Sequence, residues 1–429
     1  MTLTGIISAI GNNNSVYPLI VRDCGIEVPS KIALTYNQNK KESKEIAKLA
    51  ARERFLDEYA VSAVWLGGIP LVGKVADYFI KKQGYNPDVN LKLFNKNSVQ
   101  NIDDNIKNFS TKVSKEIIDE LKAVKNNKPA YEKLLAVKFA ASTTIPILFM
   151  GVILPKLIFA SSARKIEQQR QKEAQKNRDS FKSSNVNFQK SIDFMNRKNT
   201  SFKGSWVSAA ANFSTVDKMA VTDGGYALGR VGTARNKNEA IDVGFKMAGM
   251  MFLNFVAPKY IEKYLDKFIA KTSGLEVALD PLMLNNEEFI KNIKNKTLKL
   301  PKNLNEKEIL EFIDKNPDSI FVKYARKFGK VKFLENNIRD PRAFVDIKDI
   351  VKFKENIESF MNKAAVSKSI EKYAKKAKAV KSVNILTNIG LSSFLLAYAL
   401  PKAQFAFRKL VTGSDLEPGL APAKKTISG

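Results

Sequence analysis

Residues 382–401, SVNILTNIGLSSFLLAYALP, carry no charge and are bounded by Lys381 and Lys402. At about 1.5 Å of rise per residue, a helix of this length spans about 30 Å, the thickness of the hydrocarbon core of a bilayer. The stretch therefore predicts a membrane-inserted helix over 382–407. It also sets the question for the rest of the chain, which is how many similar helices accompany it.

A second uncharged window, FAASTTIPILFMGVILP, occupies residues 139–155. If Lys156 extends its ammonium group toward the membrane surface, as long cationic side chains do near a boundary, the apolar run reaches Ala163. A basic cluster, ARKIEQQRQKEAQKNR, follows this window, and another, KKAKAVK, precedes the window at 382–401. Such clusters are typical of segments beside anionic lipid. We therefore predict a second inserted helix over 139–163.

Two shorter windows complete the set of four, which we number in chain order as 59–73, 139–155, 247–258 and 382–401. Residues 59–73, YAVSAVWLGGIPLVG, favour an inserted helix over 59–80 that soon meets charged side chains. Residues 247–258, MAGMMFLNFVAP, predict a helix over 243–258 whose apolar length is more typical of a buried or interfacial segment. We thus expect two to four inserted helices, although four core helices of a soluble protein would also be apolar on every side.

Each window ends in proline or glycine followed by lysine, at positions 73–74, 155–156, 258–259 and 401–402. This recurrence suggests an internal repeat of helical units. The spacers between the units differ widely, however, and proline and lysine are also common at the ends of helices that are unrelated to one another.

The composition excludes several kinds of chemistry. The chain has 429 residues, a formal net charge of +28, no histidine and one cysteine, Cys24. Without histidine there is no Ser-His-Asp or Cys-His nucleophile and no histidine-ligated metal, and one thiol cannot form an internal disulfide or a cysteine-ligated cluster. Carboxylates remain as metal ligands, but their spacing matches no calcium loop. We therefore expect no enzymatic activity, catalytic residue, metal site or cofactor.

Between the windows, residues 16–36 contain short β-branched runs broken by glycine and proline, which predict a small β-hairpin. The start MTLTGIISAIG lacks a preceding basic region and a cleavage site, so we expect no cleavable signal peptide. The predicted fold is mainly α-helical, with soluble basic lobes between the apolar helices. Outside those helices we expect an N-terminal segment (1–58), a helical lobe (81–138), a basic helix with a Gly-rich linker (164–242), a basic helical lobe (259–381) and a disordered tail (408–429).

Two segments have the character of anion sites. Residues 68–75, GIPLVGKV, fit a phosphate-binding loop around Lys74, except that valine stands where the magnesium-binding hydroxyl belongs. The alternative is a kink or close helix packing. The second segment, DGGYALGRVGTAR, contains Gly225, Gly229, Arg230 and Arg235; it could expose backbone N–H groups to a phosphate, or its glycines could allow close helix packing.

Residues 320–333, IFVKYARKFGKVKF, predict a basic amphipathic face formed by Lys323, Arg326, Lys327 and Lys330. Such a face suits an anionic membrane surface or, with aromatic side chains beside it, the phosphates of a nucleic acid. A solvated charged face over a packed aromatic core is the alternative. Because cations are spread along most of the chain and no nucleic-acid module is evident, the membrane surface is the favoured partner.

The sequence therefore predicts a non-enzymatic, integral membrane protein whose basic lobes bind anionic lipid head groups or a protein partner. Residues 164–381, the longest and most basic connecting region, are expected on the cytoplasmic side. Two alternatives remain open: a soluble helical protein associated with nucleic acid, whose apolar windows form its core, and a nucleotide-using enzyme with a degenerate phosphate loop at 68–75.

Overall fold

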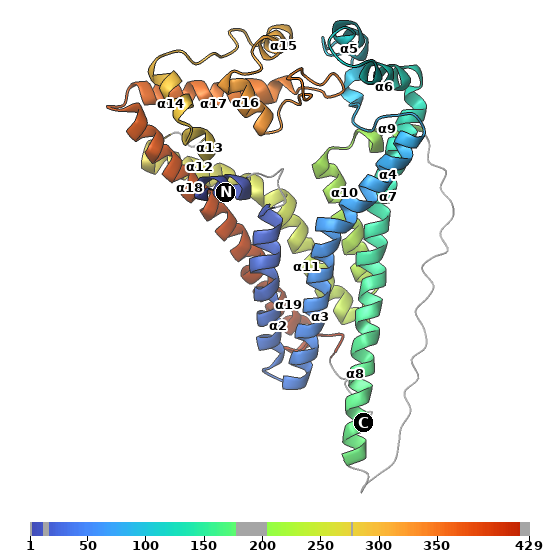
Figure 1. Cartoon of the computed structure of the whole chain (residues 1–429). Coiled ribbons are helices and arrows are strands. Elements are labelled where there is room, and N and C mark those ends of the chain that lie inside the picture. The colour runs from blue at the N-terminus through green and yellow to red at the C-terminus, as the bar shows by residue number, and fades with distance from the viewer. Residues whose placement is uncertain (1, 12–16, 177–203, 276–277, 421–429) are drawn as a thin grey trace. The chain divides into compact units, whose positions relative to one another are not determined.

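A computed structural model describes residues 2–11, 17–176, 204–275 and 278–420 of the chain, and the regular elements among them are helical (Figure 1). No strand occurs in these ranges; the β-structure found there is an isolated antiparallel bridge between Phe333 and Arg339. The prediction of a mainly α-helical protein is therefore confirmed.

The predicted β-hairpin near the N-terminus is wrong. Within 16–36, residue 16 lies outside the described residues, and the rest is helical, in η1 (Leu19–Glu27, π-helical) and α2 (Val28–Asn39). The β-branched residues here fit a helix because α2 packs along α3, and packing overrides a weak β-propensity.

All four apolar windows lie in helices that are long and apolar enough to cross a membrane, the two shorter windows included. These helices span Lys44–Lys82, Lys128–Gln168, Lys237–Ser273 and Ile370–Thr412. Their parts are α3 (Lys44–Ala63), η2 (Val64–Gly68) and α4 (Ile69–Lys82); α7 (Lys128–Leu148), η4 (Phe149–Ile153) and α8 (Leu154–Lys176); α11 (Lys237–Met251), η5 (Phe252–Val256) and α12 (Ala257–Ser273); and α18 (Ile370–Phe394), η6 (Leu395–Ala399) and α19 (Leu400–Thr412).

Each of these four helices is interrupted by a π-helical segment that ends two residues before a proline. The prolines are Pro70, Pro155, Pro258 and Pro401, and the same relation holds for η1 and Pro29. A proline within a helix lacks the N–H donor and its ring clashes with the carbonyl four residues earlier, so a locally widened turn relieves the clash. The proline and lysine endings at 155–156, 258–259 and 401–402 thus coincide with a recurring backbone feature, and in the first helix this feature precedes Pro70.

The remaining helices are shorter. Those that carry the connecting segments are α1 (Leu3–Gly11), η3 (Leu91–Phe94), α5 (Ile102–Phe109), α6 (Lys115–Asn126), α9 (Gly204–Asn212), α10 (Thr215–Gly232), α13 (Pro281–Leu284), α14 (Glu287–Lys294), α15 (Glu306–Lys315), α16 (Ile320–Lys327) and α17 (Ile347–Ala365). The chain divides into two compact units: residues 1–27, 71–135 and 250–399 form the first, and residues 28–70, 136–249 and 400–429 form the second.

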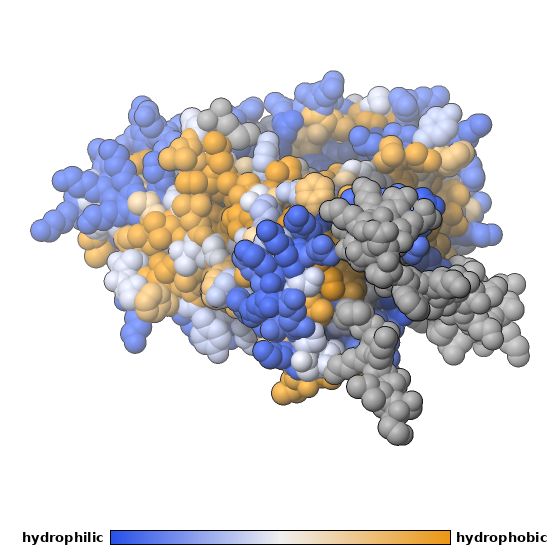
Figure 2. All heavy atoms as spheres, turned by 90° about the horizontal axis from the view of Figure 1, so that it is seen from below, coloured by the Kyte–Doolittle hydropathy of each residue, from blue (hydrophilic) through white to orange (hydrophobic). Residues whose placement is uncertain are grey.

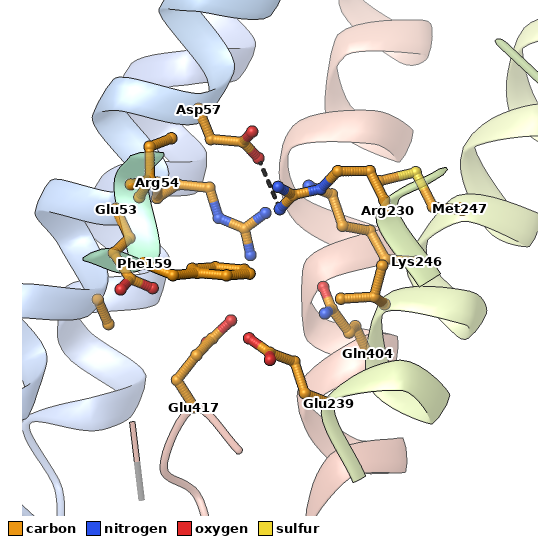
Figure 3. A pocket seen from close by; sticks show the side chains of 13 residues that line it. Glu53, Arg54, Asp57, Phe159, Arg230, Glu239, Lys246, Met247, Gln404 and Glu417 are labelled. Carbon is orange, nitrogen blue, oxygen red and sulfur yellow. Dashed lines mark ion pairs between the residues drawn. The ribbon is translucent and has the colours of Figure 1, made fainter. Parts of the chain in front are cut away.

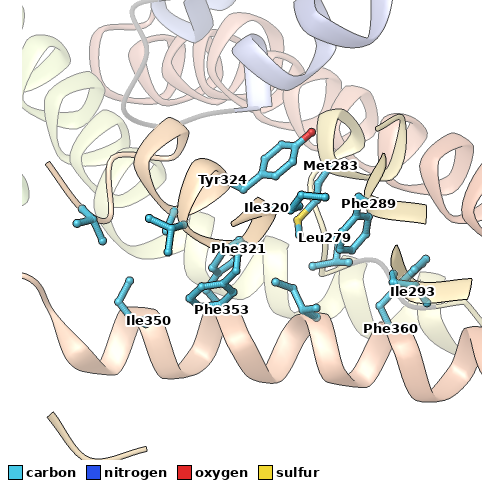
Figure 4. Packing of buried hydrophobic residues seen from close by; sticks show 14 of the residues in the cluster. Leu279, Met283, Phe289, Ile293, Ile320, Phe321, Tyr324, Ile350, Phe353 and Phe360 are labelled. Carbon is cyan, nitrogen blue, oxygen red and sulfur yellow. The ribbon is translucent and has the colours of Figure 1, made fainter. Parts of the chain in front are cut away.

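The first unit holds the main hydrophobic core. The helix α17 has apolar residues three and four apart, and Phe353 and Phe360 on this face pack against Phe321 of α16 and Phe289 of α14 (Figure 4). Burying side chains of this size stabilises a fold by roughly 1.5–3 kcal/mol each. In the predicted basic segment, Phe321 and Tyr324 are therefore core residues, and Phe328 and Phe333 pack partly buried against the core.

Two segments of the first unit that are far apart in the sequence form one lobe. The buried amide of Gln100 donates from Nε2 to the Val345 carbonyl at 3.0 Å and accepts from the Val345 N–H at 2.8 Å. Arg342 bonds Glu120 at 2.8 Å, and Phe344 packs against the core of α5 and α6. The lobes predicted separately at 81–138 and 259–381 thus share one folded domain, called the joint lobe below (residues 83–127 and 274–369).

In the second unit, α10 packs closely against η4 through glycine. A Cβ atom added at Gly229 would lie 2.9 Å from the Cα of Gly151, and one at Gly225 would lie 2.5 Å from a methyl group of Ile147. The chain after α19 also belongs to this unit, because Leu416 and Leu420 are buried. Ordered structure therefore extends through much of the segment expected to be a tail, and residues 421–429 lie outside the described residues.

Candidate functional site: a buried charge cluster

Of the predicted anion-binding residues, Lys74 belongs to the first unit, and the two glycines and two arginines belong to the second. Lys74 is exposed on α4, and residues 68–75 belong to η2 and α4, so this segment is helical and has no loop to surround a phosphate. Gly225 and Gly229 face α7 and η4 from within the helix α10. Their small size serves close helix packing, as the alternative interpretation of the sequence held.

Arg230 and Arg235 are turned toward carboxylates. Arg230, near the end of α10, pairs with Asp57 of α3 at 3.1 Å. Arg235, in the short connection to α11, pairs with Glu53 at 2.9 Å and with Glu239 at 2.7 Å. Both guanidinium groups are thus held by acidic side chains of this chain.

Further ionised residues surround these pairs. The carboxylate of Glu58 on α3 accepts from Lys246 of α11 at 2.9 Å and lies 3.2 Å from Arg54 and 3.5 Å from Lys31 of α2. Each of these four side chains is about a tenth exposed or less. One carboxylate therefore gathers three cations from α2, α3 and α11.

Arg408 of α19 has a side chain with no exposed surface, and it forms the second centre of the cluster. Its Nε and Nη2 atoms donate to the two oxygens of Asp242 at 3.0 and 2.9 Å, and Nη2 also lies 2.9 Å from Glu417. Gln404 adds a bond of 2.8 Å to Asp242. A planar guanidinium that meets a carboxylate in this bidentate way makes one of the stronger polar interactions in proteins.

Together these side chains form what we call the charge cluster. It contains six cations and six carboxylates, so its formal charges cancel: Lys31, Arg54, Arg230, Arg235, Lys246 and Arg408, with Glu53, Asp57, Glu58, Glu239, Asp242 and Glu417. Several of them line a cavity of about 30 Å³. Glu239 and Glu417 point into it from one side, and the guanidinium groups of Arg54 and Arg230 point toward each other above the ring of Phe159 (Figure 3). A space of this size holds one or two water molecules.

The ring of Phe159 on α8 joins the cluster to the second long helix. The guanidinium of Arg235 lies 4.1 Å from the ring centroid and that of Arg230 lies 6.0 Å from it. Gly419 lies against the other side of Arg235, and a side chain there would collide with the guanidinium and with Glu239. The cluster therefore ties together α2, α3, α8, α10, α11, α19 and the segment after α19.

Neighbouring opposite charges keep Arg230, Arg235 and Glu417 of the charge cluster ionised. Burial lowers the pKa of Arg230, but the facing Asp57 outweighs this and leaves the pKa raised. Burial likewise lowers the pKa of Arg235, but hydrogen bonding to Glu239 and the charge of Glu53 outweigh this and leave the pKa raised. Burial raises the pKa of Glu417, yet Arg408 and Arg54 reverse the effect and hold that pKa below its ordinary value. These groups are therefore ionised at neutral pH.

Not every polar atom of the cluster is satisfied. Nε and Nη1 of Arg230 and Oδ1 of Asp57 are buried without a hydrogen-bond partner among the described residues. Water in the adjacent cavity can supply such partners. Within the described part of the chain no group of three or more acidic or sulfur ligands could hold a metal ion. The chemistry that the cluster offers is mutual charge neutralisation, which holds helix ends together.

The predicted basic face lies on α16 in the first unit. Lys323, Arg326 and Lys327 are exposed, and Lys330 follows the helix and is partly exposed. Gly329 ends the helix in a left-handed conformation with φ 69°. Phe321 and Tyr324 are buried beneath these cations, and Phe328 and Phe333 are partly buried, so most of the aromatic surface of the segment is withdrawn from solvent.

Sequence reasoning found Arg230 and Arg235 but missed the rest of the charge cluster. The available signal was the run ERFLDE, residues 53–58, directly before the first apolar window, together with Asp242, Lys246 and Arg408 flanking the third and fourth. Charges beside an apolar window are also typical of a helix boundary, and pairing between distant helices cannot be read from spacing within one helix.

Comparisons of the chain with protein-family profiles, with characterised proteins and with solved structures gave no match.

Proposed function

We propose that this chain is a non-enzymatic integral membrane protein that crosses the bilayer four times and binds anionic lipid head groups through its basic lobes. The observation that carries the proposal is the joint lobe. Its two parts share a hydrophobic core and side-chain hydrogen bonds, so they lie on the same side of any membrane.

This arrangement restricts the number of crossings. The chain between residues 127 and 274 contains the second and third apolar windows, and it must cross an even number of times to return to the same side. If the strongly apolar second helix crosses, the third therefore crosses as well. The short third window, MAGMMFLNFVAP, is then a membrane segment although its 12 residues rise by only about 18 Å along a helix. The flanking Lys246 and Lys259 would therefore extend their side chains toward the two surfaces.

The charge cluster supports the same topology independently. It joins residues that precede the first and third windows, such as Glu58 and Lys246, with residues that follow the second and fourth, such as Phe159 and Arg408. Four helices that alternate in direction bring these ends to one side. The clustering of charges outside the apolar windows also avoids the cost of an unpaired charge in hydrocarbon.

Exposed apolar side chains favour lipid over water around these helices. Ile145, Phe149, Phe252, Leu386 and Phe394 are each more than a third exposed although they lie in the apolar windows. Hydrophobic residues also gather on the face of the molecule drawn in Figure 2, beside hydrophilic ones. Contiguous apolar surface of this kind is typical of membrane or interaction surfaces.

Four crossings change the expected placement of residues 164–381. Residues 204–236 would face one side and the joint lobe the other, so the region 164–381 would not lie wholly in the cytoplasm. Two observations argue against the alternatives. Lys74 lies in a helix rather than a phosphate loop, which disfavours a nucleotide-using enzyme. The aromatic rings of α16 are buried and not available to stack on bases, which disfavours a nucleic-acid-binding protein.

Alkaline carbonate extraction of membranes from cells that express the full chain tests the insertion. We expect the protein to remain in the pellet, and its release into the supernatant would contradict insertion. Flotation of purified protein with phosphatidylglycerol and with phosphatidylcholine vesicles tests the lipid preference. We expect more protein bound to the anionic vesicles at low salt, with the difference reduced by added salt.

A further inference from the structure

The helix α12, directly after the third apolar window, presents two parallel rows of exposed side chains. Lys259, Lys263, Lys267 and Lys271 recur every four residues and form one row. Tyr260, Tyr264 and Phe268 form the second row, with 55%, 67% and 65% of their surfaces exposed. Residues four apart lie on the same side of a helix, so a cationic row of about three turns runs beside an aromatic row of about two turns.

Neither row is needed to hold α12 in place. The helix packs on α18, where buried Asn384 donates to Asp266 at 2.6 Å, and Ile261, Leu265 and Ile269 are the partly buried apolar residues of α12. Among the described residues no carboxylate lies within ion-pair distance of the four lysine ammonium groups. The rows are thus exposed for a reason other than packing.

A similar surface follows the first apolar window. The order Asp-x-Phe-Ile-x-Lys occurs at residues 77–82 in α4 and again at residues 266–271 in α12. In the same register Lys74 corresponds to Lys263, and Leu71, Val75 and Phe79 form an exposed apolar row like that of α12. Lys74 and Lys82 thus match two of the four lysines of α12, while Pro70 and Tyr78 stand at the positions of the other two.

We propose that α12 is the site at which the protein binds anionic phospholipid, lying at the membrane interface on the side of the joint lobe. Its aromatic rings would enter the boundary between head groups and acyl chains, where tyrosine and other amphipathic rings are enriched, and its lysines would bind the phosphates. The partner is a lipid leaflet because α12 continues directly from an apolar window of the same helix. This inference rests on the proposed membrane insertion.

The face on α16 is the natural comparison, because it carries the same number of cations. Its aromatic neighbours Phe321 and Tyr324 lie in the hydrophobic core, and Phe328 and Phe333 are partly buried against that core, so its rings are less accessible than those of α12. The face on α12 offers both charge and accessible rings. A pair of variants that remove four positive charges from one helix or the other therefore separates specific lipid binding from a general effect of net charge.

The test uses the full chain in detergent micelles and measures binding of phosphatidylglycerol and phosphatidylcholine by native mass spectrometry. The variant K259Q/K263Q/K267Q/K271Q is expected to lose at least tenfold in phosphatidylglycerol binding, because each cation near an anionic surface contributes about 1 kcal/mol. The matched variant K323Q/R326Q/K327Q/K330Q is expected to stay within twofold of the original protein. In lipid-free detergent, both variants should melt as the original protein does; the pair K263Q/K267Q replaces the first should it fail to fold.

The outcomes separate the two proposals. Equal losses in both four-residue variants, or no loss in the α12 variant, would overturn α12 as the binding site while leaving lipid binding intact. No preference for phosphatidylglycerol by the original protein would overturn the proposed lipid binding itself. A third variant, Y264A/F268A, should weaken binding of both lipids, and an effect on phosphatidylglycerol alone would contradict the role given to the aromatic row.

Discussion

Replacing Arg408 by methionine tests the charge cluster most severely. The guanidinium of Arg408 is completely buried and neutralises Asp242 through two hydrogen bonds while contacting Glu417. Methionine fills a similar length without a charge, so the substitution leaves two carboxylates facing each other in a buried site. Breaking a buried ion pair by removing one partner costs about 3–5 kcal/mol, and we expect a loss of this size in the free energy of unfolding.

The loss of unfolding free energy should depend on how many carboxylates are left unpaired. In the double variant R408M/D242N one of the two stranded carboxylates is gone, so the combined loss should be smaller than the sum of the single losses by at least about 1.5 kcal/mol. Arg326→Met on α16 provides the control. That guanidinium is exposed and hydrogen-bonds Asn337, and its loss should change stability by no more than about 0.5 kcal/mol.

Unfolding of the full chain in mixed micelles of mild detergent and sodium dodecyl sulfate, followed by circular dichroism, gives these free energies. A loss below about 1 kcal/mol for Arg408→Met would refute the view that the cluster stabilises the second unit. Strict additivity in the double variant would refute direct coupling between Arg408 and Asp242.

Three further predictions concern other parts of the structure. Gly229→Ala should destabilise by about 1–3 kcal/mol because its Cβ would meet the backbone of η4, whereas Gly232→Ala, with open space around its Cβ, should be neutral or slightly stabilising; the same unfolding assay compares them. Gln100→Ala should lower the stability of the joint lobe by about 1–3 kcal/mol because it strands the buried N–H of Val345, and amide hydrogen exchange there should accelerate. Because Glu417 has a pKa below its ordinary value, its stabilising effect is present above pH 4.5 and is lost as pH falls through the folded-state pKa; Glu417→Gln should flatten the fall in melting temperature on acidification, and an unchanged slope would contradict this.

The helical class and the positions of the apolar helices could be predicted because both depend on local signals. An uncharged run such as residues 382–401 and the 3.6-residue period of an amphipathic helix are visible in the sequence alone. The β-hairpin prediction failed because β-branched residues around Gly25 and Pro29 have only a weak preference, which the packing of α2 along α3 overrides.

Pairings between distant segments could not be predicted. The contact between Gln100 and Val345 joins residues that are 245 positions apart, and that between Arg408 and Asp242 joins residues 166 positions apart. Arg230 and Arg235 were singled out as cations near glycines, but their acidic partners Glu53 and Asp57 lie on another helix. Such pairings are set by tertiary packing, and a single sequence without relatives gives no signal for them.

The sidedness of single cysteines tests the four-crossing topology most directly. In a Cys24→Ser background, cysteine would replace the exposed residues Lys115 and Lys307 of the joint lobe and the exposed residues Lys165 and Lys237 beyond the second window and before the third. Sealed, oriented membrane vesicles would be treated with a membrane-impermeant maleimide before and after permeabilisation. We expect Lys115→Cys and Lys307→Cys to react from one side, and Lys165→Cys and Lys237→Cys from the other. Reaction of Lys165→Cys and Lys307→Cys from the same side would contradict the four-crossing topology.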